Sequence, residues 1–209
     1  DVYKRQVLDV GCGTGILCMF AAKAGAKKVV GVDMSNIIDQ AKVIVKANKL
    51  DHIITLVKGK MEDVDLGLGP DGKVDVIVSE WMGYFLLYES MLPSVLYARD
   101  RYLREGGILA PSHSRMVLAA ATDRGVLCER SRFWSDVYGF RMPSMTQGLS
   151  SEAATEDVEA DAIVSDVATI CDLPLEQIPV AQPSFTAPFS LHVKEACKVH
   201  GFVSWFDTW

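Results

Sequence analysis

The sequence predicts an α/β protein in which a doubly wound parallel sheet is followed by a mostly β half. Up to residue 110, short apolar segments with strand character alternate with longer segments that carry apolar residues at helical spacing. After Pro111 this alternation stops, and proline-containing links separate the remaining strand-like segments. We therefore predict one domain over residues 1–110 and a second over residues 111–209.

Composition and cysteine usage exclude several classes of protein. Of the 209 residues, 49% are hydrophobic and 23% charged, as in an ordinary globular domain. No apolar run is long enough to cross a bilayer, so we expect no membrane association. Five scattered cysteines without a C-x-x-C pair and four dispersed histidines indicate neither a disulfide framework nor a metal site. This pattern predicts a cytoplasmic or nuclear protein.

The formal charge of −6 is unevenly distributed along the chain. Eight acidic residues and no lysine or arginine lie between Met142 and Val193. No basic patch stands out elsewhere, which disfavours direct binding of nucleic acid. The acidic segment would suit a cationic polypeptide partner, or it is simply a solvated surface.

The first element is a short buried strand, Gln6–Val10, followed by the turn G-C-G-T-G. A helix is predicted over Ile16–Ala24, where Gly25 stops it. The turn glycines Gly11, Gly13 and Gly15 would let the backbone approach a ligand, and the helix N-terminus offers free N–H groups to it. This arrangement is typical of the first half of a nucleotide-binding unit.

A second strand, Lys28–Val32, ends in an acidic residue, Asp33. Asp33 stands 22 residues after Gly11, where a Rossmann-like fold positions a carboxylate for ribose hydroxyls. Alternatively, Asp33 caps the next helix, which apolar spacing predicts over Asn36–Asn48.

The third strand, Ile53–Val57, is followed by Glu62 at the sheet edge where open α/β sheets bind ligands. Glu62 could accept a hydrogen bond from an adenine amino group, or it is one more surface glutamate.

The fourth strand, Val74–Val78, leads into a loop with two carboxylates, Glu80 and Glu89, among aromatic and apolar residues. Buried charges are costly unless paired, and nothing basic lies between these two glutamates. Two carboxylates facing one pocket suit a planar cation such as a guanidinium. Alternatively, both are solvated loop residues.

A helix with Ser90 as its N-cap is predicted to run to about Arg104 and to end at Gly106-Gly107, before a fifth strand at Ile108–Ala110. In the second half, the acidic segment Gln147–Asp161 is predicted to be a mobile projection. The predicted strands of this half are Arg115–Thr122, Ile163–Ile170, Ser184–Val193 and Val199–Phe206.

At this point the residues support a family resemblance. Four motifs together resemble the type I, asymmetrically dimethylating protein arginine methyltransferases: V-L-D-V-G-C-G-T-G-I-L, V-V-G-V-D, K-G-K-M-E-D-V and S-E-W-M-G-Y-F-L-L-Y-E-S-M-L. The resemblance runs from Val7 to the end of the chain and includes F-W-S-D-V-Y-G-F in the second half. Asp33 and the run F-L-L-Y-E are most similar to the branch called protein arginine methyltransferase three.

The resemblance implies a role for each candidate site residue. It places Gly11, Gly13 and Gly15 at the methionine part of S-adenosylmethionine, Asp33 at the ribose, Met61 and Glu62 at the adenine, Glu80 and Glu89 at the substrate guanidinium, and Met91 against the substrate pocket, where it would influence which dimethylated product forms. Ordinary core packing is the alternative for Met91.

The implied activity is methyl transfer from S-adenosylmethionine to a guanidinium nitrogen of protein arginines, giving mono- and asymmetric dimethylarginine. Implied partners are glycine–arginine-rich proteins and, in the full-length protein, a second copy of the chain in a homodimer. The second domain would be an incomplete β-barrel with a helical dimerisation arm near residues 124–157. Family helices before the first strand and a histidine loop beyond Trp209 are expected outside this sequence, which puts the activity of this piece alone in question.

Two rival functions remain. A fragment or degenerate copy could bind arginine-rich peptides without turnover, although the retained Glu80 and Glu89 argue against degeneration. A Rossmann-type nicotinamide dehydrogenase is disfavoured because the turn reads G-x-G-x-G in place of G-x-G-x-x-G.

Overall fold

The structure, a computed structural model, describes residues 5–209 except 69, 124, 150, 152 and 181–183. Spatial contacts divide the chain into two compact units. The first comprises Asp1–Met116, Cys171–Thr186 and Phe206–Trp209, and the second Val117–Ile170 and Ala187–Trp205. The division at residue 110 stays a prediction.

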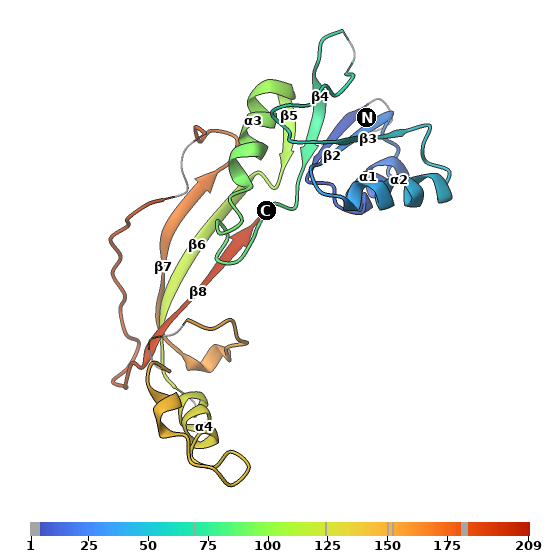
Figure 1. The fold of residues 1–209 in the computed structure, drawn as a ribbon. Helices are drawn as coiled ribbons and strands as arrows, with labels where there is room; N and C mark the ends of the chain where they lie inside the picture. Colours follow the sequence, from blue (N-terminus) through green and yellow to red (C-terminus); the bar gives the residue numbers. More distant parts are fainter. Residues whose placement is uncertain (1–4, 69, 124, 150, 152, 181–183) are drawn as a thin grey trace. The chain divides into compact units, whose positions relative to one another are not determined.

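A parallel sheet forms the centre of the first unit (Figure 1). In the described part of the chain its five strands are β1 (Gln6–Val10), β2 (Lys28–Asp33), β3 (Ile54–Lys58), β4 (Val74–Val78) and β5 (Leu103–Ala110). Their order is β3-β2-β1-β4-β5. The helices are α1 (Ile16–Lys23), α2 (Ile37–Ala47) and α3 (Leu92–Tyr102). The predicted doubly wound sheet is confirmed.

The strand order places the functional loops at one edge of the sheet. The chain runs from β1 outward to β3, then returns to β4 on the other side of β1, so the order reverses between β1 and β4. In open α/β sheets ligands bind beyond the carboxyl ends of the strands at such a reversal. The glycine turn follows β1 and the two-glutamate loop follows β4, so both reach this edge.

Apolar strand residues and one face of each helix form the core. Leu8, Val29 and Ile77 are fully buried, as expected for a sheet covered on both faces. Right-handed crossovers put α1 and α2 on one face and α3 on the other; Figure 1 shows α1 and α2 beside β2 and β3, and α3 beside β5.

A second sheet has the strand order β7-β6-β8. Its strands are β6 (His113–Ala121), β7 (Ile163–Pro174) and β8 (Gly201–Thr208). Backbone hydrogen bonds at both ends of β6 show that both of its neighbours are antiparallel. On the side of β7, Leu175 N–H donates to Ser112 C=O, and Thr122 N–H donates to Ala162 C=O. On the side of β8, His200 N–H donates to Ala121 C=O, and Trp209 N–H donates to His113 C=O.

The predicted dimerisation arm contains a helix, α4 (Val126–Phe133), and a short 3-10 helix, η2 (Pro143–Thr146). A further 3-10 turn, η3 (Ala160–Ala162), precedes β7. Residues 124, 150 and 152 of the arm lie outside the described residues, and the predicted mobility of Gln147–Asp161 stays a prediction. Among the described helices, none combines the length and apolarity that crossing a membrane requires.

Three sequence-based predictions of individual elements were wrong: the N-cap of a helix, the end of the same helix, and one strand. Met91, not Ser90, is the N-cap of α3, and Ser90 adopts a left-handed backbone with φ of 56°. The helix ends at Tyr102, and Gly106-Gly107 lies inside β5, where the register with β4 shifts at a bulge. Ser184–Val193 forms no strand in its described residues; Val193 makes one isolated antiparallel bridge with Ser165.

Candidate functional site

A cavity of about 520 Å³ lies at the carboxyl ends of the parallel strands in the first unit. Its lining combines the turn after β1, the end of β2, the segment after β3 and the loop that enters α3. The lining residues are Val10, Gly11, Val32, Asp33, Met34, Gly59, Lys60, Met61, Glu62, Asp63, Glu89, Ser90, Met91 and Ser94. Six of the nine predicted site residues are therefore brought together.

Gly11 lines this cavity and lies next to Met91. Its backbone N–H donates to the Val32 carbonyl at 2.8 Å, which ties the turn to the end of β2. Gly11 has φ of 75°, and a Cβ added there would lie 2.1 Å from Met91 Cε. A side chain at this position would therefore strain the backbone and collide with the thioether. Glycine is therefore required at this position by the left-handed backbone and by the packing of Met91.

Asp33 ends β2 at the cavity wall and already accepts three hydrogen bonds. The Gly13 N–H donates to Oδ2 at 2.8 Å, and the Ser35 N–H and hydroxyl donate to Oδ1 at 2.8 and 2.6 Å. A carboxylate offers about four acceptor positions, so one remains for a ligand hydroxyl. These bonds also hold the carboxylate in place. The bond to Gly13 couples the acid to the glycine turn.

Gly13 and Gly15 do not line the cavity. Gly13 takes part through its hydrogen bond to Asp33. Gly15 is the N-cap of α1, and a Cβ there would lie 3.7 Å from Val45 and 3.8 Å from Ala41. These are ordinary packing distances, so it is the left-handed backbone of Gly15, with φ of 81°, that favours glycine there. The turn therefore reaches the cavity through Gly11.

Met61 and Glu62 lie side by side on the segment after β3. Met61 is buried, and Glu62 is an exposed residue of the cavity wall. The Ser94 hydroxyl, on α3, donates to Glu62 Oε1 at 2.6 Å. An apolar residue followed by an oriented acceptor could hold a flat base with a donor on its edge.

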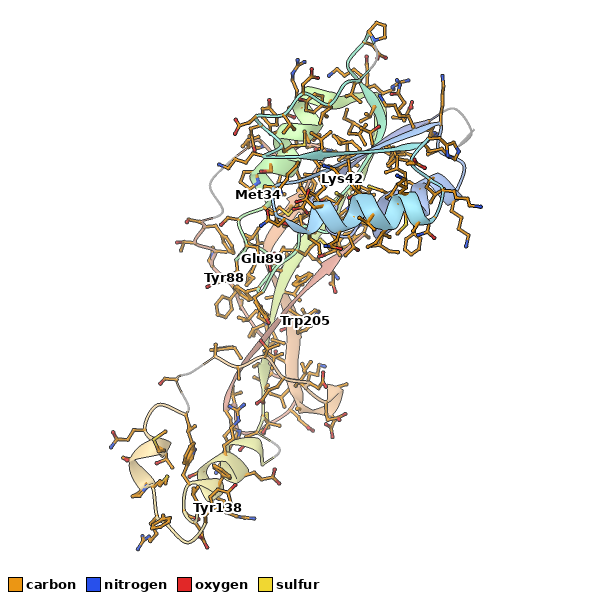
Figure 2. The ribbon with its side chains drawn as sticks, turned by 45° about the vertical axis from the view of Figure 1, so that its right-hand side comes forward. Met34, Lys42, Tyr88, Glu89, Tyr138 and Trp205 are labelled. Atoms are coloured by element: carbon orange, nitrogen blue, oxygen red, sulfur yellow. The ribbon has the colours of Figure 1, made fainter. Side chains whose placement is uncertain are left out.

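The two glutamates of the loop after β4 occupy different positions. Glu89 lines the cavity, and Figure 2 shows it with Met34 beside the start of α2. Glu80 follows the buried Ser79 directly, is exposed and does not belong to the lining. In the described structure the cavity lining therefore includes one glutamate of the predicted pair.

The loop between β4 and α3, which carries both glutamates, has an unusual backbone. Phe85, Leu86 and Ser90 all have positive φ, and an isolated bridge joins Gly83 to Leu86. Non-glycine residues in the left-handed region each cost of order 1 kcal/mol or more and concentrate at functional sites. The Glu89 side chain lies against Gly83: an added Cβ there would be 2.5 Å from Glu89 Cγ.

A buried acid, Asp9, lies one strand residue before the cavity and was not anticipated. It is 0% exposed, and Oδ1 has no hydrogen-bond partner among the described residues. The Cys18 thiol donates to Oδ2 at 3.1 Å. Burial raises the pKa of Asp9 to about 6, against the lowering effect of the Cys18 hydrogen bonds; the nearby Asp33 charge adds to the increase.

Sequence reasoning also missed Ser94, Ser90, Met34, Lys60 and Asp63, all of which line the cavity. Ser94 carried a usable signal, because residues in the first turn of a helix that follows a strand face the ligand edge of the sheet. Among the described residues, no group of three histidine, cysteine or acidic side chains could hold a metal ion.

Comparisons with known proteins agree with this geometry. Residues 7–107 match a family model described as a methyltransferase domain, and residues 112–209 match the arginine methyltransferase oligomerization subdomain. Protein arginine N-methyltransferase 1 of Schizosaccharomyces pombe is 49% identical over 203 residues, which cover 97% of this chain. The Saccharomyces cerevisiae protein of the same name is 46% identical and covers 99%. The chain spans 59% of the length of each of these curated relatives.

Two solved structures are similar over 99% of this chain and 65% of their own. They are the Trypanosoma brucei PRMT1 enzyme–prozyme heterotetrameric complex with AdoHcy, at 42% identity and TM-score 0.83, and Arabidopsis thaliana protein arginine methyltransferase 10, at 34% and 0.78. The predicted resemblance to branch three is a finer distinction that stays a prediction. The cavity lies at the strand reversal, as in other proteins with open α/β sheets, and the family models and relatives agree with it. The chain therefore belongs to the protein arginine methyltransferase family.

Proposed function

We propose that the protein to which this chain belongs transfers methyl groups from S-adenosylmethionine to guanidinium nitrogens of protein arginines, giving mono- and asymmetric dimethylarginine. One observation carries the proposal: Glu89 lines the same cavity as Gly11 and Asp33. An acceptor for a cation thus adjoins a surface suited to a nucleoside. Family membership makes the dehydrogenase alternative unfavoured.

The residues present fit S-adenosylmethionine. Gly11 lines the cavity without a side chain, so a ligand can approach its main chain on the cavity side. Asp33 keeps acceptor capacity for a ribose hydroxyl, and Glu62 for an adenine amino group. When bound, S-adenosylmethionine supplies an electrophilic methyl group whose transfer to nitrogen releases one proton.

Glu89 would act on the substrate guanidinium. Arginine stays protonated near neutral pH, so its nitrogens are poor nucleophiles. A carboxylate that accepts from two guanidinium N–H groups draws positive charge toward them and orients the remaining nitrogen. Glu89 is also our candidate to receive the released proton. Glu80 would complete the pair after the loop changes its conformation. Relief of the backbone strain at Phe85, Leu86 and Ser90 would favour such a change.

We further propose that the substrates are glycine–arginine-rich proteins of the cytoplasm or nucleus, and that the full-length protein forms homodimers. The acidic stretch between Met142 and Val193 suits cationic substrates. The match of residues 112–209 to an oligomerization subdomain supports self-association.

The test is Glu89→Gln in the full-length protein, with radiolabelled methyl transfer to a glycine–arginine peptide. We expect methylation to fall by at least about 100-fold, because the neutral amide cannot polarise the guanidinium. Cofactor binding, measured by calorimetry, should stay near wild type. Glu105→Gln, an exposed glutamate on β5 outside the cavity lining, is the matched control. Near-normal turnover of the Glu89 variant would refute the proposal, and peptide binding without turnover by the wild type would favour a non-catalytic module.

A further inference from the structure

Ser94 makes a contact in the cavity that the proposed reaction has not yet used. Its hydroxyl donates to Glu62 Oε1 at 2.6 Å, and both residues line the cavity. In the described part of the chain, this is the one hydrogen bond to the Glu62 carboxylate. The orientation of Glu62 therefore depends on Ser94.

The two residues differ in how firmly they are held. Ser94 lies in the first turn of α3, and its backbone N–H donates to the Met91 carbonyl at 3.1 Å. The neighbours Val95 and Leu96 are buried and anchor the helix. Glu62 is exposed on a turn after β3. Fixing an exposed glutamate in one conformation costs side-chain entropy. A short hydrogen bond from a residue on a rigid helix offsets that cost.

We propose that Ser94 is a positioning residue that orients Glu62 and thereby selects a nucleoside with a 6-amino purine base; this rests on the proposed function. An ionised carboxylate only accepts hydrogen bonds. With Oε1 occupied by the serine hydroxyl, Oε2 remains for a donor in the cavity. Adenine presents an amino group at position 6, whereas hypoxanthine presents a carbonyl oxygen there, which a fixed carboxylate repels. A freely rotating Glu62 would turn away and discriminate less.

Helix α3 provides a matched control one turn further along. The Tyr97 hydroxyl lies 3.5 Å from the Glu62 backbone carbonyl, and Tyr97 is not part of the cavity lining. A contact of that length to a main-chain oxygen is weak and does not orient the carboxylate. Tyr97→Phe therefore removes a hydroxyl near Glu62 and leaves the hydrogen bond between Ser94 and Glu62 intact. Ser94→Thr retains a hydroxyl at the position of Ser94.

The experiment measures binding of S-adenosylhomocysteine and S-inosylhomocysteine to the full-length protein by calorimetry. For Ser94→Ala, the dissociation constant of the adenosyl compound should rise about fivefold, which corresponds to about 1 kcal/mol. The inosyl compound should bind at least as tightly as it does to wild type, because the released carboxylate can turn away from its carbonyl oxygen, so the preference falls by at least the same factor. Ser94→Thr should keep the wild-type ratio, and so should Tyr97→Phe. In steady-state kinetics, Ser94→Ala should raise KM for S-adenosylmethionine and leave kcat unchanged.

The outcomes separate this inference from the proposed function. An unchanged adenosyl-to-inosyl ratio in Ser94→Ala, with wild-type binding of S-adenosylhomocysteine intact, overturns the role of Ser94 alone. Failure of the wild-type protein to bind S-adenosylhomocysteine overturns both. A general weakening of both ligands to the same degree in Ser94→Ala and Ser94→Thr would show a structural effect and would also overturn the positioning role.

Discussion

Asp9 is the residue whose ionisation should couple the stability of the first unit to pH. It is fully buried beneath the glycine turn, with one carboxyl oxygen unpartnered among the described residues. A hydrogen bond with Cys12, burial and the Asp9 carboxyl all raise the pKa of the neighbouring Cys18 thiol, which therefore stays protonated and donates to Asp9. One weak donor does not offset the loss of water around a carboxylate.

The sign follows from the two states of the chain. The pKa of Asp9 rises from 3.8 to about 6 on folding, so the folded protein favours the protonated acid. Its contribution to stability is fully present below about pH 4 and is lost as the pH rises through about 6. The loss amounts to about 3 kcal/mol, from 1.36 kcal/mol per pKa unit. Asp9→Asn, which does not ionise, should gain about that much stability relative to wild type between pH 4 and pH 7.

The measurement is urea unfolding of the full-length protein at several pH values, with wild type and variant compared at each. Asp51→Asn, at an exposed aspartate, serves as the control and should show no such trend. A difference between wild type and Asp9→Asn that does not vary with pH would contradict the assignment.

At the scale of elements, the loop between β4 and α3 determines where Glu89 lies. Its bridge between Gly83 and Leu86 and its left-handed residues bring Glu89 back across Gly83. A methyl group at Gly83 would meet Glu89 Cγ at 2.5 Å and Cβ at 3.0 Å. Glu89 would have to move, and with it the carboxylate.

We therefore expect Gly83→Ala to lower kcat/KM for a peptide substrate by roughly 10- to 100-fold, since a displacement of about 1 Å in a positioning group can cost that much. Binding of S-adenosylhomocysteine should stay within about twofold of wild type, because Gly83 does not line the cavity. Gly201→Ala is a suitable control, since no atom lies within 4 Å of the added methyl group. Full activity of Gly83→Ala would show that Glu89 does not need this position.

Elements with a strong local pattern were predictable, and those that depend on distant partners were not. The short apolar runs of β1 and β2 predicted strands, and both strands are buried along most of their length because helices cover both faces of the sheet. The apolar run of β4 predicted its strand in the same way. Gly106-Gly107 resembles a helix stop, and only its pairing with β4 through a bulge makes it part of a strand. Ser184–Val193 has strand composition but, apart from the Val193 bridge, no pairing partner in its described residues.

The site residues likewise divide into those that could be predicted from the sequence and those that could not. Gly11, Asp33, Glu62 and Glu89 were predictable because each stands at or beyond the carboxyl end of a strand, which faces the ligand edge. The different positions of Glu80 and Glu89 were not, since they depend on positive φ at residues that rarely adopt it. Ser94 was predictable as well, because the helix start expected at Ser90 already placed it in the first turn, which faces the ligand edge.

At the scale of the whole molecule, the predicted arm carries exposed apolar side chains in the second unit. Tyr138, labelled in Figure 2, is 97% exposed. Phe133, Phe140 and Met145 are exposed as well. Aromatic groups left in water are typical of association surfaces. Together with the match to an oligomerization subdomain, this exposure supports the arm as the contact of the proposed homodimer.

Replacing Tyr138 and Phe140 together by serine should therefore weaken the proposed homodimer of the full-length protein. Aromatic anchors contribute most of the free energy at such interfaces, so the dissociation constant should rise by at least about tenfold, measured by sedimentation velocity over a dilution series. Val167→Ser removes an exposed apolar side chain from β7 and should leave association unchanged. If the double variant sediments as the wild type does at every concentration, the arm is not the dimer contact, and the two aromatic residues must serve another surface.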